Sequence, residues 1–187
     1  IIVFGDYDVD GICGSAILWE TLSRVGANVL PYIPSRFEEG YGLSIKGIDN
    51  LIKEDKEVDL IITVDNGIVA NEAVDYAVSK GIDVIITDHH VSSTNKPKAF
   101  SIVHTTLLCG TGVAYLLSKS FKKKDDDNHL ELVVLATIAD LVPLNGASRI
   151  LVKLGLPKLR KTKRIGLVSL FEEAMLDPEK IDTYEIG

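Results

Sequence analysis

The sequence predicts an α/β protein with a doubly wound, mainly parallel sheet of about five strands flanked by helices, followed by a helical C-terminal part. Strand-like and helix-like segments alternate over residues 1–103. The strand-like segments are continuous apolar runs rich in β-branched residues, which are typical of strands that are covered on both faces. From residue 112 onward, apolar residues recur at helical spacing.

The first three elements form a βαβ unit: a strand at Ile1–Phe4, a helix at Gly14–Val25 and a strand at Asn28–Ile33. Two helix–strand pairs and a short strand follow, at Ser44–Lys53, Leu60–Val64, Ala70–Lys80, Asp83–Thr87 and Ser101–Val103. Gly81 is expected to end the helix before it. The later helices are expected at Gly112–Lys122, His129–Ala139, Arg149–Leu159 and Leu167–Met175, and the charged run Lys122–Asn128 is expected to be a solvated loop.

The length and composition suit one well-buried domain with a helical tail. The chain has 187 residues, of which 46% are hydrophobic, and no Pro- or Ser-rich linker interrupts its first 140 residues. We expect a first domain at 1–147 and a helical extension at 148–187. Because the sequence starts at Ile1, inside an expected strand and without an initiator Met, we expect it to be an excised fragment.

Charge and cysteine usage narrow the class of protein. The net charge of −7 and the isoelectric point near 5.1 argue against binding of polyanions over the whole surface, so any contact with nucleic acid must be focal. Cys13 and Cys109 have no Cys-x-x-Cys spacing, which indicates neither a zinc knuckle nor a disulfide framework and suits a reducing cytoplasm. No apolar run reaches the roughly 18 residues that span a bilayer, so we expect no membrane contact.

Acidic and histidine residues cluster where the expected strands end, and one more Asp closes an apolar helix. Carboxyl ends of parallel strands share one edge of a sheet, where ligands bind. Carboxylates crowded in one turn repel each other unless a cation neutralises them, so a divalent metal is the economical explanation. Carboxylates with imidazole suit Mn²⁺, or alternatively Mg²⁺, and such a set can hold two ions. The residues are Asp6, Asp8, Asp10, Asp65, Asp88, His89, His90 and Asp140.

Each motif also has a purely structural explanation. Asp-x-Asp-x-Asp-Gly resembles the start of a calcium loop, but Ile17 stands where an EF-hand needs Glu. A single Asp often forms a turn or caps a helix, and Asp65-Asn66-Gly67 alone is an ordinary turn sequence. The weight of these residues as a site therefore comes from their combination and their expected position.

The four histidines are expected to play different roles. His89 and His90 are adjacent, so their side chains are expected to diverge, with one serving as a metal ligand and the other contacting substrate. His104 and His129 have no acidic neighbours at a strand end, and we expect both to be ordinary loop or surface residues.

The order of these motifs resembles that of the DHH phosphoesterase superfamily. Its four motifs correspond to Asp6-Tyr7-Asp8-Val9-Asp10-Gly11, Asp65-Asn66-Gly67, Asp88-His89-His90 and Ala136–Leu144. Three further segments resemble the RecJ branch, which consists of single-strand-specific 5′→3′ DNA exonucleases: Ile33–Leu43, Leu108–Tyr115 and Arg149–Leu156. The resemblance covers almost the whole chain.

The resemblance implies a role for each site residue. Asp65 would bridge two ions, Asp6 would orient or complete the site, and His90 would contact the scissile phosphate. Arg36 would contact a phosphate, with a helix-side salt bridge as the equal alternative. Many members carry His where this chain has Phe4, which implies fewer protein ligands for one metal. The implied metal ligands are Asp8, Asp10, Asp65, His89 and Asp140.

The implied function is a metal-dependent hydrolase, a single-stranded-DNA-specific 5′→3′ exonuclease of DNA repair and recombination that uses Mn²⁺ or Mg²⁺, two ions in all. Residues 1–147 would be its catalytic domain and 148–187 the start of an inter-domain linker, whose basic segment Lys153–Arg164 is either a solvated helix or part of a track for the strand. The expected second domain has no counterpart before Gly187. The alternatives are a phosphodiesterase for oligonucleotides or cyclic dinucleotides, and a non-catalytic replication scaffold. A single-strand-binding protein or a helicase is a partner that the residues themselves do not indicate.

Overall fold

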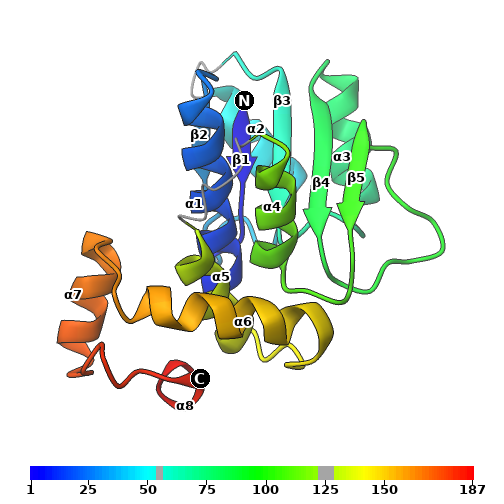
Figure 1. The fold of residues 1–187 in the computed structure, drawn as a ribbon. Helices are drawn as coiled ribbons and strands as arrows, with labels where there is room; N and C mark the ends of the chain where they lie inside the picture. Colours follow the sequence, from blue (N-terminus) through cyan, green and yellow to red (C-terminus); the bar gives the residue numbers. More distant parts are fainter. Residues whose placement is uncertain (54–56, 122–128) are drawn as a thin grey trace.

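Five strands form one sheet in which neighbouring strands run parallel (Figure 1). The computed structural model describes residues 1–53, 57–121 and 129–187. The strand order is β2-β1-β3-β4-β5, so β3 is central. The strands are β1 Ile2–Phe4, β2 Leu30–Tyr32, β3 Leu60–Val64, β4 Asp83–Asp88 and β5 Ser101–His104. The predicted doubly wound parallel sheet of five strands is confirmed.

Eight helices accompany the sheet within the described ranges, and their bounds differ from the expected ones by up to five residues. The unexpected one is the short α8, although Asp182 and Glu185 form a capping box at its start. None of the described helices combines the length and the apolar character needed to cross a membrane. The run 122–128, expected to be a loop, lies outside the described residues. The helices are α1 Val9–Arg24, α2 Ile45–Lys53, α3 Asn71–Ser79, α4 Gly110–Lys119, α5 Leu130–Ala139, α6 Gly146–Leu159, α7 Ile165–Glu173 and α8 Thr183–Ile186.

Both faces of the sheet are covered, as the continuous apolar runs predict. Successive side chains of a strand point to opposite faces, so Phe4 packs on the side of α2 and α3 while Val3 packs on the side of α1 and α4 (Figure 1). The strands β1, β3 and β4 are largely buried, whereas the edge strands β2 and β5 are more exposed. The central strands therefore hold the loops that follow them in fixed positions.

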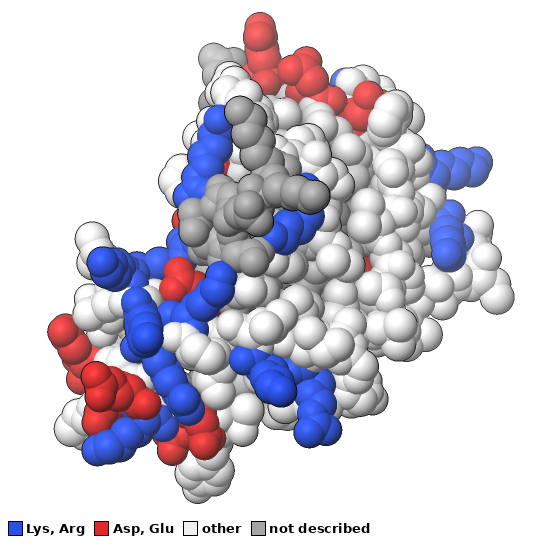
Figure 2. Space-filling model, in the orientation of Figure 1, with Lys and Arg blue, Asp and Glu red and all other residues white. Residues whose placement is uncertain are grey.

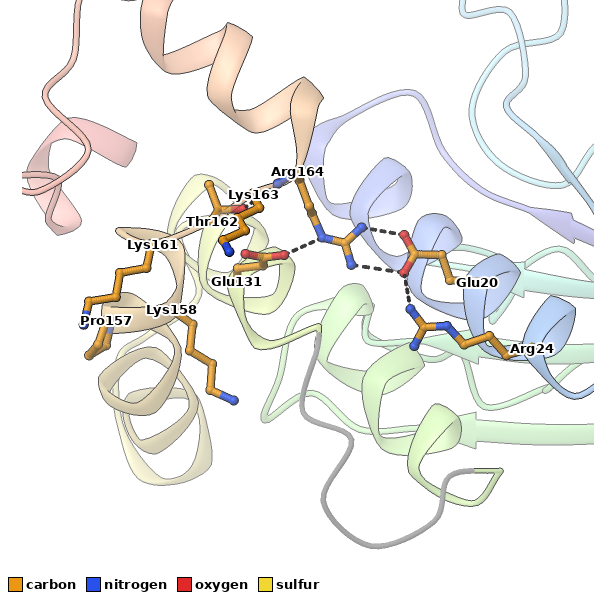
Figure 3. A pocket seen from close by; sticks show the side chains of 9 residues that line it. All are labelled: Glu20, Arg24, Glu131, Pro157, Lys158, Lys161, Thr162, Lys163 and Arg164. Carbon is orange, nitrogen blue, oxygen red and sulfur yellow. Dashed lines mark hydrogen bonds and ion pairs between the residues drawn. The ribbon is translucent and has the colours of Figure 1, made fainter.

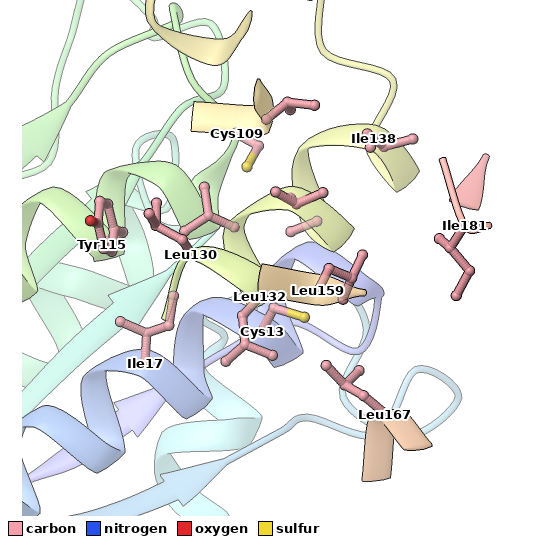
Figure 4. Packing of buried hydrophobic residues seen from close by; sticks show 14 of the residues in the cluster. Cys13, Ile17, Cys109, Tyr115, Leu130, Leu132, Ile138, Leu159, Leu167 and Ile181 are labelled. Atoms are coloured by element: carbon pink, nitrogen blue, oxygen red, sulfur yellow. The ribbon is translucent and has the colours of Figure 1, made fainter. Parts of the chain in front are cut away.

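The C-terminal helices share a core with the rest of the chain (Figure 4). This core joins Ile17 of α1 and Tyr115 of α4 to Leu132 of α5, and it extends to Leu159 of α6 and Phe171 of α7. Apart from Glu131 and Thr137, the helix α5 is apolar, which is typical of a helix buried between other elements. The helical extension after residue 147 thus packs directly on α5.

A polar network lies beside this core and holds α7 to α1 and α5 (Figure 3). The guanidinium of Arg164 pairs with Glu20 of α1 and donates to Glu131 of α5. The ring of His129 is completely buried, with its Nε2 2.9 Å from Glu20 Oε2. Our expectation that His129 is an ordinary loop or surface residue is therefore wrong. His129 directly precedes α5, and Glu20 provides a hydrogen-bond partner for its buried ring. Its hydrogen bond to His129, together with Arg164, lowers the pKa of Glu20 to about 2.

The Glu20 network predicts a specific acid sensitivity. The folded-state pKa of about 2 lies below the ordinary value of 4.5, so stability from this group is complete above pH 4.5 and is lost as the pH falls towards 2. We expect Glu20→Gln to lower the free energy of unfolding at pH 7 by about 1–3 kcal/mol, since it weakens a buried hydrogen-bond network. Thermal melts between pH 7 and pH 3 measure this, and the variant should lose less stability in acid than the wild type.

The control for this prediction is Asp177→Asn, which removes a surface ion pair with Lys180. This variant should change the melting temperature little at pH 7. Equal acid sensitivity of the wild type and Glu20→Gln would contradict the assigned role of Glu20.

Candidate metal centre

The predicted site residues come together at the carboxyl edge of the sheet. His89 follows β4, and its Nε2 lies 3.1 Å from Asp65 Oδ1 at the end of β3. The same nitrogen is 3.6 Å from Asp140 Oδ2 at the end of α5 and 3.7 Å from Asp10 Oδ2 in the first turn of α1. One imidazole thus faces carboxylates from three other elements of the fold.

Among the described residues, the site contains three overlapping groups of side chains that could hold a metal ion. In each group, one ligand atom per residue lies within 4.8 Å of the others. Asp65 and His89 each belong to two groups, so the groups form one continuous centre. The groups are Asp65, His89 and His90; Asp10, His89 and Asp140; and Asp6, Asp8 and Asp65.

The first acidic motif is the start of a helix as well as part of the site. Asp8 caps α1, with its Oδ1 accepting the backbone N–H of Gly11 at 2.9 Å. This cap lets α1 begin at Val9, five residues before the expected start. A side chain at Gly11 would collide with the backbone of Asp6, so the tight path of the motif requires glycine. Asp8 therefore caps the helix and also lies close to Asp6 and Asp65.

Asp10 is fixed by the N-terminus of α4, a connection that we did not predict. Its two carboxylate oxygens accept the backbone N–H groups of Gly110 at 2.6 Å and Thr111 at 2.7 Å. The hydroxyl of Thr111 also donates to the backbone oxygen of Asp10. The signal was available in the Gly-Thr-Gly that opens α4, since free N–H groups at a helix start attract carboxylates.

Asp65 combines a left-handed backbone conformation with a buried carboxylate. Its φ of +63° lies in the left-handed region, and its buried Oδ1 has no hydrogen-bond partner among the described residues. Burial, and then the carboxylates of Asp10 and Asp8, raise the pKa of Asp65 to about 10. A Cβ at Gly110 would approach Asp65 Cβ to 2.5 Å, so this glycine gives Asp65 its room. Burial and Asp10 raise the pKa of Asp140 in the same way.

Asp88, to which we had assigned no role, positions the histidine pair. Its Oδ1 accepts the backbone N–H groups of His89 at 2.7 Å and His90 at 3.1 Å, and lies 2.8 Å from His90 Nδ1. Its Oδ2 accepts the N–H of Ile68 at 2.8 Å. Burial acts to raise the pKa of Asp88, but these hydrogen bonds outweigh it and lower the pKa.

His90 sits at the rim of the site with 45% of its side chain exposed. Its Nε2 lies 3.1 Å from the hydroxyl of Tyr41, and that hydroxyl donates to the backbone oxygen of Asp65 at 3.1 Å. The hydrogen bond with Asp88 raises the pKa of His90. The ring centroids of His89 and His90 lie 4.5 Å apart. The two side chains therefore do not diverge as expected, although they contact different partners.

Two further residues considered in the sequence are His104 and Phe4. His104 is the last residue of β5, and its Nε2 lies 2.7 Å from the backbone oxygen of His90. It therefore supports the His90 loop, and our expectation of an ordinary loop or surface residue is wrong. Phe4 is fully buried in the core beside Tyr32 and offers no ligand.

Asp6 and Arg36 differ sharply in their environments. Asp6 is fully buried, its oxygens have no hydrogen-bond partner of good geometry among the described residues, and burial raises its pKa. Arg36 is exposed in a turn, with its Cζ 5.3 Å from the ring centroid of Tyr7. Arg36 forms no salt bridge with a described residue, so the alternative of a helix-side salt bridge is wrong.

One cavity lies apart from these residues. It has a volume of about 770 Å³, and it lies between α1, α5 and the segment that joins α6 to α7 (Figure 3). Lys and Arg side chains are spread over this part of the surface (Figure 2). The cavity takes in the second half of the basic segment that ends at Arg164, whose guanidinium is engaged by Glu20 and Glu131. The lining residues are Glu20, Arg24, Glu131, Pro157, Lys158, Lys161, Thr162, Lys163 and Arg164.

Comparison with known proteins points to nucleases. The single-stranded-DNA-specific exonuclease RecJ of Bacillus subtilis is 39% identical over 181 residues, which cover 92% of this chain and 23% of that protein. RecJ of Escherichia coli is 36% identical over 213 residues, covering 100% of this chain and 37% of that protein. The chain thus spans less than two-fifths of the length of these relatives.

Solved structures agree with this similarity. A crystal structure of exonuclease RecJ bound to manganese superposes with a TM-score of 0.86 at 34% identity, covering 99% of this chain and 49% of that one. RecJ of Thermus thermophilus in complex with Mn²⁺ gives a TM-score of 0.80 at 31% identity, with 99% and 28% covered. The sequence profile described as DHH family, N-terminal domain, matches residues 1–142. Since this match spans most of the sequence and includes the acidic motifs described above, the chain belongs to the DHH family.

Proposed function

We propose that this chain is the catalytic core of a metal-dependent phosphodiesterase, a hydrolase that digests single-stranded DNA in the 5′→3′ direction. The observation that carries the proposal is the convergence of His89 with Asp10, Asp65 and Asp140, in which the buried Oδ1 of Asp65 lies 3.1 Å from His89 Nε2 but has no hydrogen-bond partner among the described residues. The relatives described as single-stranded-DNA-specific exonucleases support the substrate class. The direction of digestion is taken from the RecJ branch.

The donor set fits divalent cations. Carboxylates crowded at the sheet edge and the raised pKa of Asp65 favour a positive charge at the centre of the site. Oxygen ligands with one imidazole suit Mn²⁺ or Mg²⁺, and relatives have been solved with both. We assign Asp8, Asp10, Asp65, His89 and Asp140 as ligands of two ions, with Asp65 shared. When bound, the ions supply activation of the attacking water and neutralisation of the phosphoester charge.

Other residues orient the substrate and the ligands. His90 lies at the exposed rim, where its cationic form contacts the scissile phosphate and offsets charge in the transition state. Asp88 and Tyr41 hold the His90 ring in place. Asp6 adds a buried carboxylate to the group of Asp8 and Asp65 and so completes the acidic wall of the site. Arg36 contacts a phosphate of the strand.

The biological setting follows from the same relationship. The proposal places the chain in DNA repair and recombination in the cytoplasm, with single-stranded DNA as its partner and a single-strand-binding protein or helicase as the class of protein partner. Residues 1–147 form the catalytic unit, and 148–187 lead towards a second domain. A non-catalytic scaffold is disfavoured because the ligand set is complete, and the relatives do not favour a small-substrate enzyme.

Nuclease activity tests the proposal directly. Adding Mn²⁺ should release mononucleotides from a 5′-phosphorylated single strand, and chelation by EDTA should stop the release. The Asp65→Ala, Asp140→Ala double variant should lose essentially all activity, which chromatography of the products measures. Full activity of this variant would contradict the assignment, and preference for dinucleotides over long strands would favour the small-substrate enzyme.

The adjacent histidines should have separable effects. His89→Ala should weaken Mn²⁺ binding by more than about 100-fold, because even the partners of metal ligands are worth about 10–100-fold in affinity. His90→Ala should keep Mn²⁺ affinity and lower kcat by about 10²–10³-fold, the usual cost of a lost transition-state contact. Calorimetry with Mn²⁺ and single-turnover kinetics measure the two effects. An equal loss of Mn²⁺ affinity in both variants would rule out this division.

We expect the carboxylate of Asp65 to lower the stability of the metal-free chain and to be required for metal binding. Asn has the same shape, tolerates a left-handed backbone and carries no charge. We therefore expect Asp65→Asn to stabilise the metal-free chain by about 0.5–2 kcal/mol. The variant should also show no rise in melting temperature when Mn²⁺ is added, whereas the wild type should show one. Asp177→Asn is the matched surface control, and a less stable metal-free Asp65→Asn chain would refute the idea that charge crowding strains this position.

A further inference from the structure

A row of planar side chains runs along the rim of the site. Arg36 Cζ lies 5.3 Å from the centroid of the Tyr7 ring. The Tyr7 ring meets Tyr41 nearly at right angles with 6.4 Å between centroids, and Tyr41 meets His90 in the same manner at 5.9 Å. The row therefore connects an exposed guanidinium to the histidine that faces the scissile phosphate.

The metal chemistry does not account for the outer part of this row. Tyr41 supports His90, but Tyr7 and Arg36 donate nothing to the ligands in the described structure. Both stay accessible, since Arg36 is exposed and Tyr7 is only partly buried. Phe37, the next residue along the chain, is 96% exposed, so this turn presents a second ring to solvent. Tyr7 lies between Asp6 and Asp8 in the sequence, so its backbone belongs to the first acidic motif.

The chemistry of the row suits a nucleobase. Arginine planes and aromatic rings are the side-chain surfaces on which unpaired bases stack. The acidic centre repels phosphates away from the cations, whereas the uncharged face of a base has no such conflict with Asp6 and Asp8. A base inside a duplex has both faces covered by its neighbours, so it cannot reach such a surface.

We propose that Tyr7 and Arg36 form a stacking platform for one unpaired nucleobase of the strand whose phosphate lies at His90. The inference rests on the proposed phosphodiesterase function and adds to it a physical source of single-strand preference. The guanidinium of Arg36 offers its face to the base while its N–H edge remains available to a phosphate.

Two oligomers with equal charge test the platform by binding. One is oligothymidylate, and the other has the same length and the same phosphates but only abasic tetrahydrofuran sugars. Fluorescence anisotropy measures the Kd of each for the 187-residue chain, with Ca²⁺ present to neutralise the carboxylates. The wild type should bind oligothymidylate about tenfold or more tightly than the abasic strand.

Variants assign this preference to the named side chains. Tyr7→Leu should bring the ratio of the two Kd values close to one, and Tyr7→Phe should keep it because the ring remains. Arg36→Lys keeps the charge but removes the plane, so it should lower the ratio of the two Kd values. Tyr184→Leu removes an exposed tyrosine of α8 and should leave the ratio as in the wild type.

The outcomes separate this inference from the proposed function. Equal affinity of the wild type for the two oligomers overturns the platform, and so does a Tyr7→Leu variant that weakens both by the same factor. Absence of measurable oligothymidylate binding also overturns it. Failure of the proposed function shows instead as a lack of Mn²⁺-dependent hydrolysis, which leaves the ratio of the Kd values intact.

Discussion

Repulsion among buried carboxylates is the constraint around which this structure is built. Asp6, Asp10, Asp65 and Asp88 are all nearly inaccessible to solvent at one edge of a sheet. Each unpaired charge in such a place is costly. The fold meets part of this cost with backbone N–H groups, which serve Asp10 from α4 and Asp88 from the loops after β3 and β4. The part left over, centred on Asp65, gives the site its demand for cations.

Backbone amides also explain why the site is built on a sheet. The parallel order places the ends of β1, β3 and β4 side by side, and the loops after β3 and β4 donate backbone N–H groups to Asp88. Asn66 strengthens this arrangement, since its side-chain amide donates to the backbone oxygens of Gly5 and Val64 while its oxygen accepts the N–H of Leu43. The residue that reads as an ordinary turn former therefore ties three loops together.

The fold was largely predictable because its signals are local. The β-branched runs and the helical spacing act within a few residues, and they located all five strands and seven of the eight described helices. The clustering of the acidic and histidine residues was predictable for a related reason, since strand ends of a parallel sheet converge. The start of α1 was misplaced because the first motif offers three aspartates, and the structure shows that Asp8 is the one that caps the helix.

The remaining features depend on contacts between distant segments. Thr111 holds Asp10 across 101 positions in the chain, and His129 reaches Glu20 across 109. The spacing of residues in the sequence does not reveal such pairs. We therefore assigned no role to Thr111 and expected His129 to be an ordinary loop or surface residue. The contact between Tyr41 and His90 could not be predicted for the same reason, because it joins two segments that are far apart in the sequence.

The helix α1 has a consequence for the whole chain. Its first turn carries Asp10, and Glu20 lies further along the same rod, where it holds Arg164 and His129. At 1.5 Å per residue, the two acidic residues are separated by about 15 Å of continuous helix. A displacement of α1 would therefore move a carboxylate of the acidic centre together with the residue that anchors the C-terminal helices.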